Sequence, residues 1–351
     1  MKKETNKNKI FTLSFNPKQV VKRLLSPLPD RAQDVIVGRF GFNPEGKEMT
    51  LEAIGKKYGI TRERVRQIEN YAISHIRKAD TYEKESAVFD ELKKTINKMG
   101  GVVSEKDLLN HLGKDTLTKK YIHFLLVVGD DFSKLKEDLE FKRRWHVDET
   151  LSEKIHEAIR KLYSGLGDDE IIPESEIIRS FLEHLKDVSE DYKEDEILTR
   201  WLSISKNISK NPLGEWGKTK SSNIKTKGVR DYAYLILRKH GSPIHFREVA
   251  KLISEVFKKK AHVATTHNEL IKDPRFVLVG RGLYALKEWG YSTGVVRDVI
   301  LEILKKNGPL NKDKILEKVL KERYVKANTV MVNLQNPKYF KKNKQGLYTV
   351  V

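Results

Sequence analysis

The stretch from Thr50 to Ile68, TLEAIGKKYGITRERVRQI, constrains the fold more than any other part of the chain. Apolar residues recur at helical spacing on both sides of Gly59: Leu51, Ile54 and Tyr58 before it, and Val65, Ile68 and Ala72 after it. Gly55 falls where two crossing helices would touch, and Gly59 falls where the turn needs a positive φ. Thr61 is a suitable N-cap for the second helix. The pattern predicts a helix-turn-helix.

Four polar residues, Arg62, Glu63, Arg66 and Gln67, share the face of the second helix opposite its apolar stripe. Arginine can contact guanine through two hydrogen bonds, glutamine can do the same to adenine, and glutamate can accept from cytosine. The alternative is an ordinary solvated face whose charges pair along the helix. Because the glycines and both apolar stripes agree with a helix-turn-helix, the pattern favours DNA recognition.

The segments LPDRAQDVIVGRFGF and TLEAIGKKYGITRERVRQIE resemble region 4 of the sigma-70 family of bacterial transcription initiation factors, over about residues 16–80. The resemblance implies recognition of the −35 promoter element and docking on the flap of the RNA polymerase β subunit. By position, it assigns base contacts to Arg62, Glu63 and Gln67, and DNA backbone contacts to Thr61, Arg64 and Arg66. About fifteen residues precede the match. We therefore expect a −35 reader without the parts of a sigma factor that bind and melt the −10 element.

The length of 351 residues predicts several small domains, and the composition narrows the class of protein. No segment is apolar enough to cross a bilayer, and the basic start MKKETNKNKI lacks the apolar core of a signal peptide. The absence of cysteine excludes disulfides and thiolate zinc sites and fits a reducing compartment. We expect a cytoplasmic, nucleoid-associated protein with a flexible N-terminus over residues 1–15.

The formal net charge of +19 is unevenly distributed. Residues 1–80 hold 17 Lys and Arg against 9 Asp and Glu, and residues 220–351 hold 28 against 11. Residues 81–219 between them hold 23 against 29. A polyanion such as double-stranded DNA would be attracted to the two ends of the chain and repelled by its middle.

After the first 82 residues the chain repeats one plan four times. Each copy has a helix, a short apolar step, two further helices and a segment with β character. The step residues Val103, Ile172, Ile244 and Leu310 are separated by 69, 72 and 66 positions. That order is typical of a winged helix, and the period indicates serial copies. The predicted fold is mainly α with small β wings: a helix-turn-helix over residues 16–82, then winged helices over 83–148, 149–221, 222–291 and 292–351.

The third copy, with VRDYAYLILRKHGSPIHFREVAKLI and DPRFVLVGRGLYAL, resembles the HARE-HTH domain. That winged-helix family includes the N-terminal domain of the RNA polymerase delta subunit, and the resemblance implies contact with nucleic acid or a transcription complex. The outward polar residues expected on its third helix, about residues 262–272, are His262, Thr265, Thr266 and Asn268. The cations expected on the DNA backbone are Lys258, Lys259, Lys260, Arg275 and Arg281 here, and Lys341, Lys342 and Lys344 in the fourth copy. The alternative is that these lysines only keep small domains soluble.

The sequence contains no recognisable catalytic centre. Its ten histidines are scattered, and a phosphate-binding GxxxxGK[ST] loop is absent. We expect no enzyme activity, no metal, no cofactor and no small-molecule substrate. Three functions remain open: a sigma-like transcription factor that recognises a −35 element together with RNA polymerase, a polymerase-associated interaction subunit without specific DNA recognition, and a targeting module of a restriction or modification system.

Overall fold

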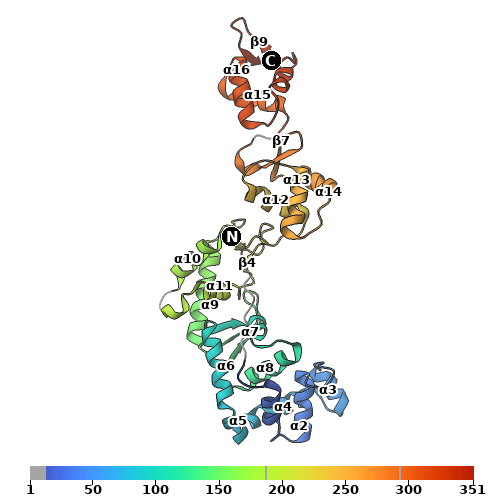
Figure 1. Ribbon diagram of the computed structural model, residues 1–351, viewed down its shortest axis with the longest axis vertical. Helices are drawn as coiled ribbons and strands as arrows, with labels where there is room; N and C mark the ends of the chain where they lie inside the picture. The colour runs from blue at the N-terminus through green and yellow to red at the C-terminus, as the bar shows by residue number, and fades with distance from the viewer. Residues whose placement is uncertain (1–12, 186–187, 292–293) are drawn as a thin grey trace. The chain divides into compact units, whose positions relative to one another are not determined.

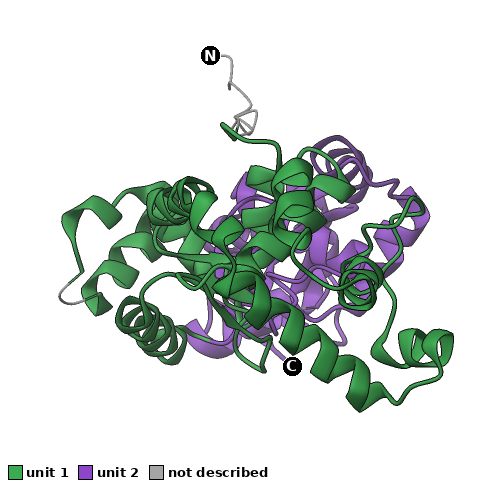
Figure 2. Cartoon of the chain, turned by 90° about the horizontal axis from the view of Figure 1, so that it is seen from below, with its two compact units in different colours: residues 1–167, 172–209 green, residues 168–171, 210–351 purple. Residues whose placement is uncertain are grey.

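The computed structural model describes residues 13–185, 188–291 and 294–351, and these are mainly helical with small antiparallel sheets (Figure 1). The chain divides into two compact units, residues 1–167 with 172–209, and residues 168–171 with 210–351 (Figure 2). The mainly helical structure with small sheets confirms the predicted fold class. Residues 1–12 of the predicted flexible N-terminus lie outside the described residues. Leu13 and Phe15 pack against the core of the first unit, and the Ser14 amide donates to Glu91 at 2.9 Å.

The predicted helix-turn-helix is present in the first unit. Its helices are α1 (Pro17–Leu25), α2 (Asp30–Phe40), α3 (Leu51–Tyr58) and α4 (Arg62–Lys78). The Thr61 hydroxyl caps α4 by accepting from the Arg64 amide at 3.2 Å. Gly59 ends α3 with φ of 65°, and a Cβ on Gly55 would lie 2.6 Å from the Ile60 carbonyl oxygen. Both glycines are therefore required for the turn.

Further helices and a small sheet follow α4. They are α5 (Asp80–Lys84), α6 (Ser86–Lys98), α7 (Glu105–Leu112) and α8 (Thr116–Val128), with strands β1 (Val102–Ser104), β2 (Ser133–Leu135) and β3 (Arg144–His146). The strands form an antiparallel sheet in the order β1-β3-β2, with Val103 paired to Trp145. This segment supplies the support on which the helix-turn-helix rests.

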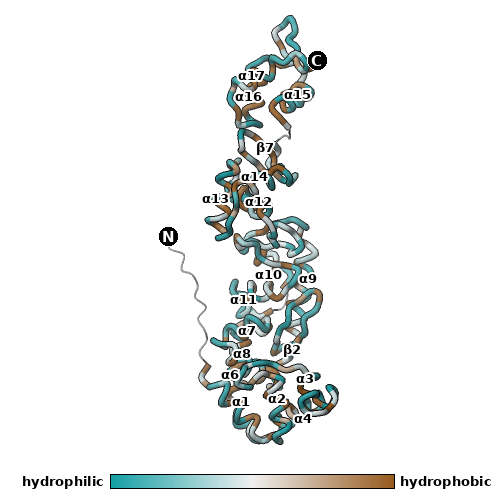
Figure 3. The backbone as a smooth tube through the Cα atoms, turned by 90° about the vertical axis from the view of Figure 1, so that its right-hand side faces the viewer, coloured by the Kyte–Doolittle hydropathy of each residue, from teal (hydrophilic) through white to brown (hydrophobic). Residues whose placement is uncertain are grey.

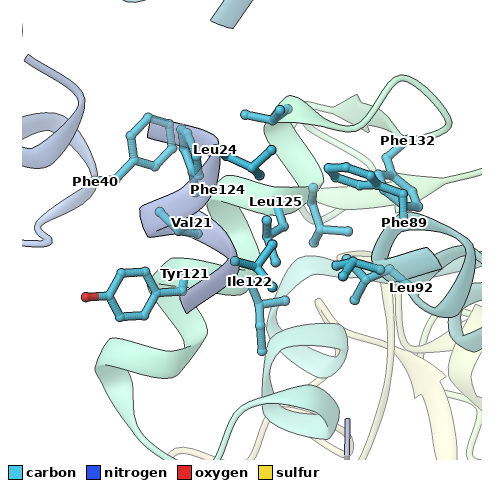
Figure 4. Packing of buried hydrophobic residues seen from close by; sticks show 14 of the residues in the cluster. Val21, Leu24, Phe40, Phe89, Leu92, Tyr121, Ile122, Phe124, Leu125 and Phe132 are labelled. Atoms are coloured by element: carbon cyan, nitrogen blue, oxygen red, sulfur yellow. The ribbon is translucent and has the colours of Figure 1, made fainter. Parts of the chain in front are cut away.

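One hydrophobic core joins the helix-turn-helix to this segment. Val21 and Leu24 of α1 and Phe40 of α2 lie beside Ile122, Phe124 and Leu125 of α8, with Phe89 and Leu92 of α6 in the same cluster (Figure 4). The rings of Phe40 and Phe124 meet edge to face with centroids 4.9 Å apart. Lys120 of α8 also donates to the Gly46 carbonyl at 2.6 Å. The expected boundary between residues 82 and 83 therefore falls within a continuous core.

The rest of the first unit contains α9 (Glu149–Gly165), α10 (Glu174–His184), the 3₁₀ turn η1 (Glu190–Tyr192), α11 (Asp195–Leu202) and the start of β4 (Ile208–Lys210). The Trp201 indole of α11 donates to the Gly100 carbonyl at 3.0 Å, and Arg200 donates to the Met99 carbonyl at 2.8 Å. A Cβ on Gly100 would lie 2.7 Å from an Ile197 methyl group. Thus α11 packs closely against the turn that precedes β1.

The second unit begins with β5 (Trp216–Lys218) and then has two segments of the same plan. The first contains α12 (Val229–His240), β6 (Ile244–His245), α13 (Phe246–Phe257), α14 (Val263–Lys272), β7 (Phe276–Gly280), β8 (Leu283–Leu286) and the turn η2 (Lys287–Trp289). The second contains α15 (Val296–Asn307), α16 (Lys312–Glu322), α17 (Ala327–Leu334), β9 (Phe340–Lys342) and β10 (Tyr348–Val350).

Each of these two segments has its own core and its own small sheet. The sheet of the first has the order β6-β8-β7, and β9 pairs with β10 in the second. The Tyr324 amide donates to the Val279 carbonyl at 2.8 Å and so connects the second segment to β7. Hydrophobic and hydrophilic stretches alternate along the helices of both units (Figure 3). Among the described residues, no helix is both long and apolar enough to cross a bilayer.

Candidate nucleic-acid interface

The N-terminal end of α4 presents a row of polar side chains to solvent. Arg62, Glu63, Arg64, Arg66 and Gln67 are exposed, whereas Val65 between them is completely buried. Thr61 is exposed as well and caps the helix, as described above. The structure therefore brings together all six residues for which the sequence predicts DNA contacts in this region. We call them the α4 row.

Hydrogen bonds hold the α4 row in order. Arg66 donates to the Glu63 carboxylate from Nε at 2.9 Å and from Nη2 at 2.5 Å. This hydrogen bond to Arg66 lowers the pKa of Glu63. Arg64 Nη1 donates to Gln67 Oε1 at 3.1 Å. Glu63 is consequently an ionised acceptor at neutral pH, which suits the amino group of cytosine.

Arg39 of α2 fixes the orientation of α4. Its Nε donates to Glu69 of α4 at 3.1 Å, and its Nη1 donates to the Met49 carbonyl, just before α3, at 2.9 Å. The side chains of Val35, Ile54 and Val65 form a small core among the same three helices. One arginine thus connects all parts of the helix-turn-helix. The sequence pattern around Arg39 does not reveal this role, because Glu69 lies 30 positions further along the chain.

A hollow of about 340 Å³ lies beside the α4 row, between α2 and α4. Pro29, Arg31 and Ala32 line it from α2 and the turn before it, and Ile68 and Tyr71 line it from α4, next to Arg64 and Gln67. The Tyr71 side chain is 52% exposed and presents its aromatic ring beside the hollow. We call this feature the α2–α4 hollow. In the sequence, Tyr71 indicates this hollow, because it is an aromatic residue one helical turn after Gln67 on the same side of α4.

The predicted lysines of the second unit lie at two places. Lys258, Lys259 and Lys260 connect α13 to α14 and are exposed, and Lys258 has a φ of 55°. The ammonium group of Lys259 lies 4.9 Å from the centre of the Tyr232 ring, so this side chain folds back on its own domain. Arg281 is exposed between β7 and β8. Lys341 and Lys342 of β9 and Lys344 in the following turn are exposed on one hairpin.

Two side chains expected to face DNA are used differently. Arg275 donates to Asp231 at 3.0 Å and to Asp273 at 2.7 Å, so its charge is neutralised within the domain. The reason is that α12 and the turn before β7 place both carboxylates around its guanidinium group. Thr266 is completely buried, and its hydroxyl donates to the His262 carbonyl at 3.0 Å. Neither residue is available for a groove contact. Of the described residues, no group of three or more His, Asp or Glu is arranged to hold a metal ion.

Known proteins are similar to this chain over the segment that contains the α4 row. Residues 24–78 match the protein family described as Sigma-70, region 4. Residues 24–78 form a sigma-70 region 4 domain. A stretch of 57 residues is also 46% identical to the RNA polymerase sigma factor RpoS of Coxiella burnetii (strain RSA 493 / Nine Mile phase I). That match covers 16% of this chain and 16% of the relative's length.

The segment that matches region 4 coincides with the helix-turn-helix. Its matched residues begin within α1 and end at Lys78, the last residue of α4. All members of the α4 row lie inside the match.

Proposed function

We propose that this protein recognises a −35-type promoter element through the α4 row and acts with bacterial RNA polymerase in transcription initiation or its regulation. The observation that carries the proposal is the exposed α4 row at the N-terminal end of α4, inside a region 4 domain. In a helix-turn-helix, that end of the second helix enters the major groove. Under this proposal the protein works on the nucleoid and needs no catalytic group.

Two kinds of contact are assigned within the α4 row. Arg62, Glu63 and Gln67 contact base edges, and Thr61, Arg64 and Arg66 contact the phosphate backbone. The pairs Glu63–Arg66 and Arg64–Gln67 are solvent-exposed. Exposed ion pairs contribute only about 0–1 kcal/mol, so DNA can replace them at little cost. Before DNA binds, these pairs keep the long side chains near the positions that they need.

We further propose that the β flap of the polymerase contacts the α2–α4 hollow. The apolar faces of α1 and α2 that turn inward are covered by α8. The α2–α4 hollow is open instead, and it offers Ile68 and the exposed ring of Tyr71. Exposed apolar surface of this kind marks protein contacts more often than it marks DNA contacts.

The four later segments, 83–148, 149–221, 222–291 and 292–351, are proposed to be winged helices, the third of the HARE-HTH type. Their element order of helix, step, helix, helix and hairpin supports this. The exposed cations Lys258, Lys260 and Arg281, and the hairpin lysines Lys341, Lys342 and Lys344, are proposed to contact DNA phosphates. Lys259 contributes less, because it lies against Tyr232.

The test measures binding of the full chain to two labelled duplexes, one with a TTGACA element and one with the same bases scrambled. We expect tighter binding to the first at physiological salt. Equal affinity for both duplexes would exclude specific recognition. A chain that binds core polymerase and shows no preference between the duplexes would instead be a polymerase-associated subunit. That second candidate is favoured by one observation: the sequence of α17 contains no cation, and that of α14 only its last residue, Lys272.

A further inference from the structure

In the two segments that follow α4, the third helix packs against another part of the chain and is not left open to solvent. In the segment after α4 the third helix is α8, and its residues Ile122, Phe124 and Leu125 are buried with α1 and α2. In the next segment the third helix is α11, which donates from Trp201 to the Gly100 carbonyl. In both cases the helix that a DNA-binding winged helix would insert into a groove packs against a neighbouring part of this chain.

The third helix of the following segment, α14, has no such neighbour among the described residues of its unit. Its Thr266 and Leu270 face the core, and the opposite side is open. Val263 is 42% exposed and Ile271 is 62% exposed, at positions i and i+8 of one helical row. His267 lies between them in the sequence, and its ring stacks on that of Phe246 with the ring centroids 4.2 Å apart. We call Val263, Ala264, His267, Asn268 and Ile271 the α14 face.

The charge of the α14 face differs from that of the α4 row. The α4 row contains Arg62, Arg64 and Arg66, whereas the α14 face contains no lysine or arginine. Its cations are at its ends: Lys258 and Lys260 before the helix, and Lys272 as its last residue, all exposed. DNA binding draws most of its affinity from cations placed against phosphates. An apolar centre with a cationic border instead complements a protein surface whose apolar side chains are bordered by carboxylates.

We propose that the α14 face docks on core RNA polymerase, at a surface with exposed apolar side chains bordered by Asp and Glu. This inference rests on the proposed association with polymerase and adds a second contact, separate from region 4. In that contact Lys258 and Lys260 face carboxylates of the polymerase, in place of the DNA phosphates assigned to them above. Two earlier third helices of the same chain, α8 and α11, are likewise covered by protein, in their case by other parts of the chain. In the second unit, α14 leaves the corresponding face open, with Val263 and Ile271 exposed on it.

The experiment compares the full chain with a Val263→Ser/Ile271→Ser double variant, which removes the apolar groups and leaves the net charge unchanged. Both positions are exposed, so the fold is expected to persist, and circular dichroism checks this. The matched control is Leu139→Ser/Val295→Ser, which alters one exposed leucine and one exposed valine elsewhere. Affinity for purified bacterial core polymerase and affinity for a promoter duplex are measured for each protein.

We expect the α14 double variant to bind core polymerase about tenfold more weakly or worse, as is typical for buried anchors at an interface. Its promoter affinity should stay within about twofold, since the phosphate-contacting cations are intact. The control variant should match the unchanged chain in both assays. Unchanged polymerase affinity in the α14 variant would overturn the inference, as would an unchanged chain that does not bind core polymerase.

A different pattern would assign the α14 face to DNA. In that case the double variant loses duplex affinity and keeps its polymerase affinity, which also overturns the inference. The proposed −35 recognition is judged separately, by the preference of the unchanged chain for the TTGACA duplex over the scrambled one. That preference depends on the α4 row, so its failure and the failure of the α14 contact give distinguishable results.

Discussion

At the scale of single residues, the α4 row combines recognition with preorganisation. The bonds between Arg66 and Glu63 and between Arg64 and Gln67 restrict four long side chains before DNA arrives. Each restricted side chain loses less conformational entropy on binding than a free one. Under the proposed function, Arg62, Glu63 and Gln67 of the row set the sequence preference, and its other members set the overall affinity.

Replacing a base-contacting residue should reduce specificity. Arg62→Ala or Gln67→Ala is expected to cost about 1–3 kcal/mol on the preferred duplex and to flatten discrimination against scrambled DNA. The physical reason is the loss of paired hydrogen bonds to a base edge. Titration of labelled duplexes by the full chain provides the measurement. The control is Asn70→Ala, because Asn70 is exposed and lies about one turn after Gln67 on α4. It should leave both affinities unchanged.

Two histidines, the half-buried His123 and the buried His156, should make the first unit sensitive to mild acid. Burial and the nearby charge of Lys134 lower the pKa of His123 to about 4, and burial and Arg144 lower that of His156 to about 4. In the unfolded chain both titrate near a pKa of about 6.5. Between these values only the unfolded state binds the protons, so stability should fall as the pH falls from about 6.5 to 4. The expected slope is about 1.4 kcal/mol per pH unit for each histidine.

Urea unfolding at pH 7.5 and pH 5.0 measures this effect. The reference is a His123→Gln/His156→Gln variant. The amide oxygen of its second glutamine could still accept from Arg144, whose Nε lies 2.8 Å from the His156 ring nitrogen in the unchanged chain. The variant should lose less stability than the unchanged chain over the same pH interval. Equal losses in the two proteins would mean that carboxylates, not these histidines, account for the acid sensitivity.

At the scale of elements, α8 is the part of the fold that supports the recognition helix. Helix α8 contacts α1, α2 and α4, and its Lys120 reaches the Gly46 carbonyl in the loop before α3. The helix-turn-helix therefore depends on residues beyond its own family match. A substitution in α8 should therefore weaken DNA binding through lost packing against the helix-turn-helix.

Phe124→Ala should destabilise the first unit by about 3–5 kcal/mol, the usual cost of removing a fully buried phenylalanine. Denaturant unfolding measures the change, and promoter binding near the new midpoint should weaken in parallel. Leu139→Ala serves as the control because Leu139 is 90% exposed. Full stability of the Phe124 variant would show that α1 and α2 do not need α8.

The sequence allowed the helix-turn-helix to be predicted in detail, because Gly55, Gly59 and Thr61 are fixed by local geometry. The support from α8 could not be predicted in the same way. Its sequence TLTKKYIHFLLVV indicates burial on several sides but does not name the partner. The pairing of Arg275 with Asp231 was missed for a similar reason, since 44 positions separate the two residues. Long-range contacts of this kind depend on packing that local patterns do not encode.

At the scale of the whole molecule, the proposed DNA contacts are divided along the chain. The region 4 domain holds the α4 row, whereas residues 220–351 carry most of the net positive charge. Within that basic region, the hairpin of β9 and β10 carries three exposed lysines, Lys341, Lys342 and Lys344. Its register pairs Lys342 with Tyr348 and Lys341 with Thr349. A hairpin of this kind is suited to follow a phosphate backbone without distinguishing bases.

The last prediction distinguishes direct phosphate contact by the hairpin lysines from attraction of DNA by the net positive charge alone. Lys341→Gln/Lys342→Gln/Lys344→Gln should weaken binding to matched and scrambled duplexes equally, because phosphate contacts carry no sequence information. The plot of log affinity against log salt should become shallower by about 0.9 for each phosphate that the variant no longer neutralises. The control, Lys305→Gln/Lys306→Gln/Lys312→Gln, removes the same charge from exposed positions on α15 and α16. If both triple variants change the slope equally, the lysines attract DNA only through net charge. If neither changes it, the basic region, residues 220–351, faces a protein, and the α14 face becomes the main contact of the second unit.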